Sequence, residues 1–241
     1  MKTSWSRQAG DDVRFEWGPA GIEVLRGDIV VVVDVLRFTT AVEAATSRGA
    51  EVFPYRPTAD GAVAYARLLD AGLADGADER GLSLSPASLL RLDRGERIVL
   101  PSLNGSACSV HAEEEGATVV AACLRNAGPV AARAQEQGGT VAVIACGERW
   151  PDGSLRPALE DYLGAGAVIA NLRGTRSPEV RAAASAWGDL EDDVAELLAT
   201  CSSGRECQHR GWSEDLRYAG EVGSSGVVPV LQAGAFVDVS T

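Results

Sequence analysis

The chain has 241 residues, 46% of them hydrophobic and 23% charged, with 34 acidic and 22 basic residues and a formal net charge of −12. Apolar runs recur along this length, so folding can bury a sizeable core and intrinsic disorder is disfavoured. The acidic balance disfavours nucleic-acid and membrane partners, but a local arginine cluster could still bind a small anion. No apolar run approaches the roughly 20 residues of a membrane span and no signal core is present, so we expect a cytoplasmic protein.

Several kinds of site can be excluded from residue types alone. Five cysteines without a CxxC pair are typical of reduced, buried thiols, and two histidines cannot form a histidine-rich zinc site. The absence of a GxxxxGK[ST] motif excludes a P-loop nucleotide site. An Asp-x-Asp phosphatase is disfavoured because Leu36, and not a second aspartate, stands two residues after Asp34. A cysteine-dependent phosphatase is disfavoured because no cysteine is followed by Arg at the sixth position. A Ser-His-Asp hydrolase is disfavoured because no GxSxG motif is present.

Short apolar runs alternate with amphipathic segments through the first two thirds of the chain. Strands are predicted at 29–35, 51–56, 97–102, 118–123 and 140–146, with helices at 39–49, 58–73, 106–115 and 126–137. Pro54 indicates that its strand lies near an edge or ends there. This alternation favours crossover connections, and therefore an α/β fold with a largely parallel or mixed sheet flanked by helices.

The last third of the chain changes character. Helices are predicted at 157–172, 178–200, 203–210 and 213–218, and the alternation of VVPVLQAGAFVDV at 227–239 predicts one or two terminal strands. No linker is long enough to separate two independent units. We therefore expect a single α/β domain over 1–241, with a helical C-terminal appendage at about 174–226 and terminal strands.

The first polar strand end follows the apolar run 29–35. Asp34 ends the strand, and Arg37, Thr39 and Thr40 lead into the next helix. Ligands of parallel α/β sheets bind beyond the carboxyl ends of the strands. A helix N-terminus with two hydroxyls and a guanidinium can hold a phosphate. The structural alternative is that Thr39 caps the helix while Asp34 and Arg37 form an ion pair.

Two further strand ends carry polar residues. In the Asn104-Gly105-Ser106 turn the glycine allows a close approach of the backbone to a ligand, and the serine offers a hydroxyl; the alternative is an ordinary turn with a cap. Arg125 and Asn126 follow the strand at 118–123. Considered without the other loops, Asn126 is interpreted as a simple N-cap.

The fourth strand end is followed by a polar loop and a pair of adjacent carboxylates. Cys146 ends the strand, and Glu160 and Asp161 enter a helix of small residues. Oxygen ligands of this kind are what Mg²⁺ selects, usually one or two carboxylates with a substrate phosphate. The alternative, to which we give equal weight, is that these carboxylates only interact favourably with the helix dipole.

Taken together and in this order, the four loops resemble the 2-phosphosulfolactate phosphatase family over roughly residues 20–235. The family has Asp-Val-Leu-Arg-x-Thr-Thr after an apolar strand, an Asn-Gly-Thr turn, a strand–Asn segment, a Cys-Ala-Gly loop leading to Glu-Asp, and a Ser-x-x-Gly-Arg run ending in Asp. The matching segments are 34–40, 104–106, 123–126, 146–161, 202–215 and the Val-Val-Pro-Val-Leu of 227–231. Two departures stand out: Gly147-Glu148 replaces Ala-Gly, and a family loop is shortened to 78–86.

The resemblance implies a Mg²⁺-dependent phosphoric monoester hydrolase that converts 2-phospho-3-sulfolactate to sulfolactate and phosphate, a step toward coenzyme M. It implies Mg²⁺ at Asp34, Glu160 or Asp161, and a sulfonate or carboxylate at Arg80 or Arg125. The implied catalytic residues are Asp34, Arg37, Asn104, Glu160 and Asp161. The implied substrate-binding residues are Thr39, Thr40, Arg80, Gly105, Ser106, Arg125, Asn126 and Cys146.

Several alternatives stay open at this point. Water can attack the phosphoryl group directly, or Asp34 can act as the nucleophile and become an aspartyl-phosphate. The shortened loop at 78–86 allows another phosphorylated hydroxy acid as the substrate. A non-catalytic binder of a phosphorylated metabolite is a further alternative, although the retained Glu160-Asp161 pair favours an enzyme. Self-association as a homo-oligomer is allowed.

Overall fold

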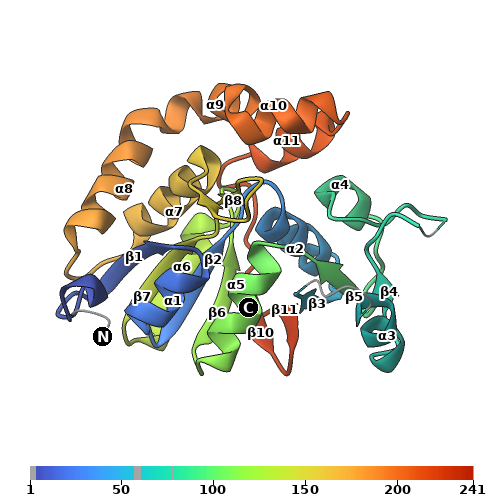
Figure 1. Ribbon diagram of the computed structural model, residues 1–241, viewed down its shortest axis with the longest axis horizontal. Coiled ribbons are helices and arrows are strands. Elements are labelled where there is room, and N and C mark those ends of the chain that lie inside the picture. The colour runs from blue at the N-terminus through green and yellow to red at the C-terminus, as the bar shows by residue number, and fades with distance from the viewer. Residues whose placement is uncertain (1–3, 57–60, 78, 241) are drawn as a thin grey trace.

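The computed structural model describes residues 4–56, 61–77 and 79–240, and its centre is a nine-stranded mixed sheet covered by helices (Figure 1). In spatial order the strands are β1 (Val13–Trp17), β7 (Val141–Ala145), β2 (Ile29–Val33), β6 (Thr118–Ala122), β10 (Pro229–Gln232), β11 (Ala235–Asp238), β3 (Glu51–Tyr55), β5 (Arg97–Pro101) and β4 (Gly72–Leu73). The predicted α/β class with a mixed sheet, C-terminal helices and terminal strands is confirmed.

Two parallel groups of strands make up this sheet. The first group is β1-β7-β2-β6 and the second is β3-β5-β4. The C-terminal hairpin β10–β11 lies between them, pairing antiparallel through Val230 with Val120 and through Phe236 with Val52. Pro54 is the penultimate residue of β3, beyond the pairing with β11, as its lack of an N–H donor predicts.

Helices cover both faces of the first group of strands. The helices and 3₁₀ turns are η1 (Ser4–Arg7), α1 (Gly18–Leu25), α2 (Phe38–Ser47), α3 (Gly61–Leu68), α4 (Pro86–Leu89), α5 (Gly105–Glu114), α6 (Ala127–Gln137), α7 (Leu159–Asn171), α8 (Pro178–Leu190), η2 (Glu191–Asp193), α9 (Val194–Thr200), α10 (Ser202–His209) and α11 (Ser213–Ala219). None of the described helices is long and apolar enough to cross a membrane.

The all-apolar β2 explains this layering. Val31 and Val33 pack into a core with α6, α7 and α8, whereas Val30 and Val32 pack into a second core with α1, α2 and α5. Successive side chains of a strand point to opposite faces, so a run of five β-branched residues requires helices on both sides. The buried character predicted for 29–35 is therefore confirmed.

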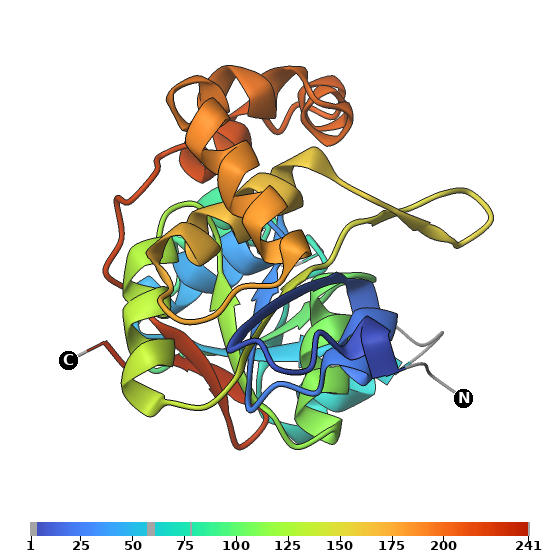
Figure 2. The same cartoon turned by 90° about the vertical axis from the view of Figure 1, so that its left-hand side faces the viewer.

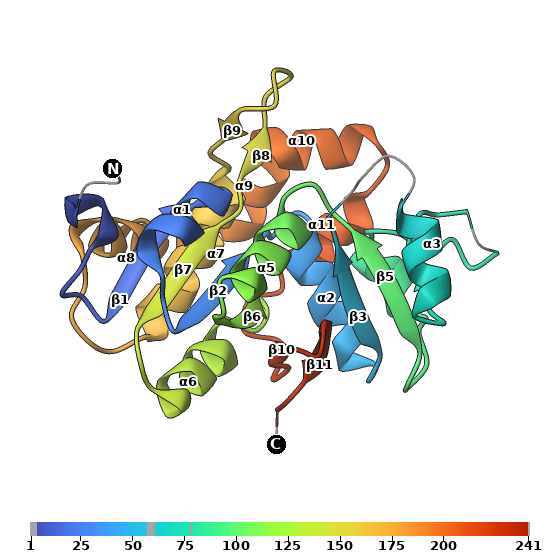
Figure 3. The ribbon, with the colours of Figure 1, turned by 60° about the horizontal axis from the view of Figure 1, so that its bottom comes forward.

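The predicted helix at 178–200 is broken in the structure. The 3₁₀ turn η2 separates α8 from α9, and the three acidic residues of η2 lie just before the N-terminus of α9, where the helix dipole favours negative charge. Together α8–α11 arch over the carboxyl ends of the first group of strands (Figures 1 and 2). A small antiparallel hairpin, β8 (Glu148–Arg149) with β9 (Leu155–Arg156), projects beside α10 (Figure 3).

Candidate active site

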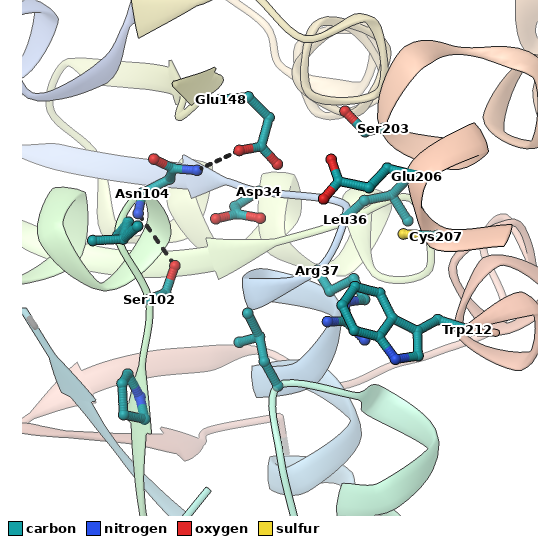
Figure 4. A pocket seen from close by; sticks show the side chains of 13 residues that line it. Asp34, Leu36, Arg37, Ser102, Asn104, Glu148, Ser203, Glu206, Cys207 and Trp212 are labelled. Carbon is teal, nitrogen blue, oxygen red and sulfur yellow. Dashed lines mark hydrogen bonds between the residues drawn. The ribbon is translucent and has the colours of Figure 1, made fainter. Parts of the chain in front are cut away.

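A pocket of about 320 Å³ lies where the carboxyl ends of β2 and β5 meet the helices α10 and α11 (Figure 4). Its lining residues are Asp34, Leu36, Arg37, Leu84, Pro101, Ser102, Leu103, Asn104, Glu148, Ser203, Glu206, Cys207 and Trp212. Three of the residues predicted to be catalytic, Asp34, Arg37 and Asn104, are thus brought together. The pocket lies at the carboxyl ends of strands, where ligands of parallel α/β sheets bind, although β2 and β5 belong to different groups of strands.

Asp34 is fixed at the floor of this pocket by two backbone donors. The N–H of Phe38 donates to its Oδ1 at 3.0 Å, and the N–H of Gly105 donates to its Oδ2 at 2.9 Å. A Cβ at Gly105 would lie 2.1 Å from the Phe38 ring, so only glycine allows this approach. Burial raises the pKa of Asp34 to about 6 despite the two backbone bonds, and the negative charge of Glu160 adds to the effect.

Arg37 lines the pocket as predicted, but its ion-pair partner differs from the structural alternative. Its Nη1 contacts Asp215 Oδ2 at 2.6 Å rather than Asp34, and its guanidinium lies 3.6 Å from the centre of the Trp212 ring. Asp215 also accepts a hydrogen bond from Ser85 Oγ at 2.5 Å. Arg37 is therefore oriented by α11 and by the turn before α4. The peptide bond from Leu36 to Arg37 is cis.

The hydroxyls of Thr39 and Thr40 do not face the pocket. Thr39 Oγ1 donates to the Asp34 carbonyl at 2.8 Å and accepts from the Asp34 N–H at 3.0 Å, and Thr40 Oγ1 donates to the Val35 carbonyl at 2.7 Å. Both side chains are fully buried. They shape the turn that presents Asp34, in place of the predicted phosphate contact. Thr39 also forms no helix cap, because Arg37 occupies that position.

Asn104 and Glu148 form the wall opposite Arg37. Asn104 Nδ2 donates to Glu148 Oε2 at 2.9 Å (Figure 4). Burial first, and the charge of Asp34 second, raise the pKa of Glu148 to about 7. Ser106 does not take part, because its hydroxyl is buried and donates to the Leu100 carbonyl at 2.8 Å.

Glu160 and Asp161 begin α7 behind the pocket and do not line it. Asp161 Oδ1 accepts from the Val35 N–H and its Oδ2 from the Gly147 N–H, each at 2.8 Å. This carboxyl ties together the loops that follow β2 and β7. Burial, with the charges of Asp34 and Glu160, raises the pKa of Asp161 well above its ordinary value. Glu160 is also buried and accepts from Cys201 Sγ at 3.5 Å.

The carboxylates were tested as a metal site. Within the described part of the chain, no three His, Cys, Asp or Glu side chains are arranged so that they could hold a metal ion. The predicted trio of Asp34, Glu160 and Asp161 is therefore not a preformed site, since Asp34 alone lines the pocket. A pair fits better: Asp34 and Glu148 both line the pocket and offer the oxygen ligands that Mg²⁺ prefers. Burial first, and neighbouring carboxylates second, raise the pKa of both groups.

Arg80 and Cys146, two further predicted substrate-binding residues, lie outside the pocket lining. Arg80 Nη1 contacts Glu96 at 2.9 Å on the exposed surface, and the preceding Asp78 lies outside the described residues. Cys146 is buried, and burial and the neighbouring Cys108 raise its pKa well above the ordinary value. Such thiols are typical of packing rather than ligand contact.

Arg125 and Asn126, the other pair outside the lining, serve the loop after β6. Arg125 Nε contacts Glu43 at 3.0 Å, and its guanidinium lies 3.6 Å from the centre of the Tyr218 ring. Asn126 Oδ1 accepts from the Cys123 N–H at 2.8 Å, so this amide bonds backwards into the loop instead of capping α6. Both arrangements stabilise the fold.

Several pocket residues were missed by the sequence argument. Glu148 was noted only as a departure from a family motif, and the residues from α10 and α11 were given no role. Those unassigned residues are the lining residues Ser203, Glu206, Cys207 and Trp212, and Asp215, which contacts Arg37 without lining the pocket. One signal was available, because all five lie within or beside the matched Ser-x-x-Gly-Arg run of 202–215.

The chain was compared with known proteins. A model of the 2-phosphosulpholactate phosphatase family matches residues 21–234. A Microcystis aeruginosa protein named "Probable 2-phosphosulfolactate phosphatase" is 27% identical over 218 residues, covering 84% of this chain and 88% of that protein. A Gloeobacter violaceus protein of the same name is 30% identical over 212 residues (84% and 87%). The Methanothermobacter thermautotrophicus "2-phosphosulfolactate phosphatase" is 29% identical over 210 residues (86% and 88%).

An α/β fold whose strand ends form a pocket of carboxylates and an arginine, together with these matches, defines a phosphoric monoester hydrolase. More particularly, the chain belongs to the 2-phosphosulfolactate phosphatase family, as the resemblance of its four loops predicts.

Proposed function

We propose that this protein hydrolyses 2-phospho-3-sulfolactate to sulfolactate and phosphate, with Mg²⁺ as the cofactor, in the route to coenzyme M in the cytoplasm. The observation that carries the proposal is one pocket that Arg37 lines together with three carboxylates, Asp34, Glu148 and Glu206. Its volume of about 320 Å³ suits a small phosphomonoester. Family membership and the names of the relatives support the choice of substrate.

Arg37 is the residue that would hold the phosphoryl group. Its guanidinium is held from one side by Asp215 and stacked on Trp212, so its orientation is set before substrate binds. A fixed planar guanidinium can donate two parallel hydrogen bonds to phosphate oxygens. Such a donor stabilises the charge that redistributes over the phosphoryl oxygens in the transition state.

Asp34 and Glu148 would hold the metal ion together with a phosphate oxygen and water. When bound there, Mg²⁺ supplies positive charge that neutralises phosphoryl oxygens and lowers the pKa of a bound water. Asn104 fixes the carboxylate of Glu148 through its amide hydrogen bond. Both oxygens of Asp34 already accept a backbone N–H, which reduces their nucleophilicity and favours direct attack by water over an aspartyl-phosphate.

A phosphate-release screen tests the proposal. The substrates are 2-phospho-3-sulfolactate, other phosphorylated hydroxy acids and p-nitrophenyl phosphate, each measured with 5 mM Mg²⁺ and with excess chelator. The expected result is the highest kcat/KM for 2-phospho-3-sulfolactate, with turnover abolished by chelator. A higher kcat/KM for another phosphorylated hydroxy acid would reassign the substrate, and full turnover in chelator would remove the metal from the mechanism.

Loss of the carboxylates separates catalysis from binding. In the variant Asp34→Asn we expect turnover to be lost, while 2-phospho-3-sulfolactate still binds to the metal-free protein because Arg37, which would hold the phosphoryl group, is retained. Equal turnover of wild type and Asp34→Asn would contradict a catalytic role for Asp34, whereas wild-type protein that binds the phosphorylated acids without turnover would favour the non-catalytic binder.

A further inference from the structure

We propose that Arg156, together with Ser203, binds the second anionic group of the substrate and so sets the specificity of the pocket. This inference rests on the proposed function, because it assigns the end of the substrate that lies away from the phosphate. Arg80 and Arg125, the arginines first expected there, bond to other parts of the fold.

The β8–β9 hairpin directs Arg156 toward the pocket. In the register of this hairpin Glu148 is paired with Arg156. Side chains that are directly opposite in an antiparallel pair lie on the same face. Glu148 lines the pocket (Figure 4), so Arg156 is on the pocket side of the hairpin as well. The positive charge of Arg156 also partly opposes the rise in the pKa of Glu148 that burial causes.

A second contact places the guanidinium at the rim. Arg156 Nη2 donates to Ser203 Oγ at 3.0 Å, and Ser203 lines the pocket at the start of α10. Figure 3 shows the hairpin rising beside α10, so the contact joins two elements that are distant in sequence. Two side chains with hydrogen-bond donors therefore meet at the rim of the pocket.

Arg156 has no direct ion-pair partner within the described residues. Across residues 4–56, 61–77 and 79–240, no carboxylate lies within 4.0 Å of its guanidinium, whereas Arg37 contacts Asp215 and Arg125 contacts Glu43. The Trp150 ring, 5.8 Å from the guanidinium carbon, is its aromatic neighbour. In a chain with net charge −12, an arginine of this kind beside a pocket is suited to an anionic ligand.

The simplest competing role is structural, in which Arg156 only ties the hairpin to α10. A structural tie acts on every substrate alike, whereas a specificity residue acts on substrates that carry a second anion. The test therefore uses four substrates with Mg²⁺: 2-phospho-3-sulfolactate, 2-phospholactate without the sulfonate, 2-phosphoethanesulfonate without the carboxylate, and p-nitrophenyl phosphate with neither.

The variants are Arg156→Gln and, as a matched control, Arg149→Gln. Arg149 is an exposed arginine of the same hairpin, bonded to the Leu103 and Gly153 carbonyls. Losing a charge-assisted contact is expected to raise the KM of Arg156→Gln for 2-phospho-3-sulfolactate about 10- to 100-fold, with a smaller change in kcat. The KM increase for p-nitrophenyl phosphate is expected to be at least about tenfold smaller. Arg149→Gln should match wild type on all four substrates.

The outcomes separate the hypotheses. Two of the four substrates lack either the sulfonate or the carboxylate. If Arg156→Gln no longer raises the KM for one of these two, the group missing from that substrate is the one that Arg156 contacts. An equal effect on all four substrates, or a wild-type KM for 2-phospho-3-sulfolactate, would overturn the assignment of Arg156. Wild-type protein that hydrolyses p-nitrophenyl phosphate but not 2-phospho-3-sulfolactate would instead overturn the proposed function. Thermal melts of both variants establish that they are folded.

Discussion

Two arginines in this molecule have nearly the same surroundings and opposite consequences. Arg37 and Arg125 each follow a strand of the first group, each contacts a buried carboxylate, and each lies 3.6 Å from the centre of an aromatic ring. Their side chains are exposed by 11% and 9%, so burial does not distinguish them. The difference lies in their remaining donors.

Arg125 is saturated by protein groups. It contacts Glu43 and Glu221 and donates to the Tyr218 carbonyl at 3.1 Å, whereas Arg37 has the single ion pair with Asp215 within the described residues. Donors that the protein does not use are available to a ligand. The number of internal acceptors, and not exposure, therefore separates a binding arginine from a structural one.

The largest effect that tests this comparison is on stability at Arg125. In Arg125→Gln the carboxylate of Glu43, exposed by only 1%, loses its positive partner. We expect the free energy of unfolding to fall by about 3–5 kcal/mol, measured by urea denaturation, because a buried charge is left uncompensated. The double variant Arg125→Met/Glu43→Leu should recover most of this loss. A loss below about 1 kcal/mol would contradict the structural role.

The corresponding change at Arg37 should act on turnover instead. Arg37→Lys replaces a planar donor with a point charge, and losing a charge-assisted contact to the transition state costs about 2–4 kcal/mol. We therefore expect kcat/KM for phosphate release to fall at least about tenfold. The melting temperature should change little, because an ammonium can still contact Asp215. Near-normal kinetics for this variant would make Arg37 a second structural arginine.

The pocket beside Arg37 also has an excess of carboxylates, which predicts a pH dependence. Burial raises the pKa of Asp34 to about 6 and of Glu148 to about 7, above their unfolded values of 3.8 and 4.5. Between these pKa values the folded protein binds more protons than the unfolded chain, so stability falls as the pH rises from about 4 to about 7. In chelator we expect a loss of at least about 3 kcal/mol over this range, because a change of one in a pKa is equivalent to about 1.4 kcal/mol.

Two controls sharpen this pH experiment, in which thermal melts are recorded across the range. Added Mg²⁺ should reduce the loss at high pH, since a bound cation favours the charged carboxylates. Glu148→Gln should flatten the profile without metal. A profile that is the same in wild type and Glu148→Gln would show that Glu148 titrates normally.

The smallest expected effect compares the two aromatic rings. Trp212→Leu removes the ring that orients Arg37, and Tyr218→Leu removes the ring beside Arg125. A cation–π contact contributes about 0.5–2 kcal/mol, so we expect the KM of Trp212→Leu to rise about two- to tenfold. Tyr218→Leu should lower the melting temperature with little change in KM. A higher KM for Tyr218→Leu, together with a lower melting temperature for Trp212→Leu, would make Arg125 the binding arginine and Arg37 the structural one.

The backbone plan of the molecule could be predicted because it depends on local patterns. The valine run of β2, the alternation of strands and helices and the polar strand ends identified the sheet and one end of it as the site. The strand β1 was missed although Val13 and Phe15 alternate with polar residues, because only five residues carry the pattern. Sequence alone could not order the strands, since the inserted hairpin depends on long-range pairing.

The roles of individual polar residues were harder to predict. A sequence shows that Thr39, Thr40 and Ser106 place hydroxyls at strand ends. Only the turn geometry shows that these hydroxyls already donate hydrogen bonds to backbone carbonyls. Arg156 is the converse case. Its position depends on the register of a short hairpin and on α10, some 50 residues away in sequence, and no local pattern encodes that meeting.

The position of the β10–β11 hairpin has a consequence for the order in which the enzyme is assembled. Asp34 comes from the first group of strands and the Gly105 N–H that holds it from the second, and within the described residues the backbone ladder between the groups runs only through residues 229–238. Translation delivers this segment after every pocket residue has been made. The sheet that aligns its two halves closes only when the hairpin inserts. The alignment of Asp34 with the Gly105 N–H therefore depends on a segment that is translated after every pocket residue.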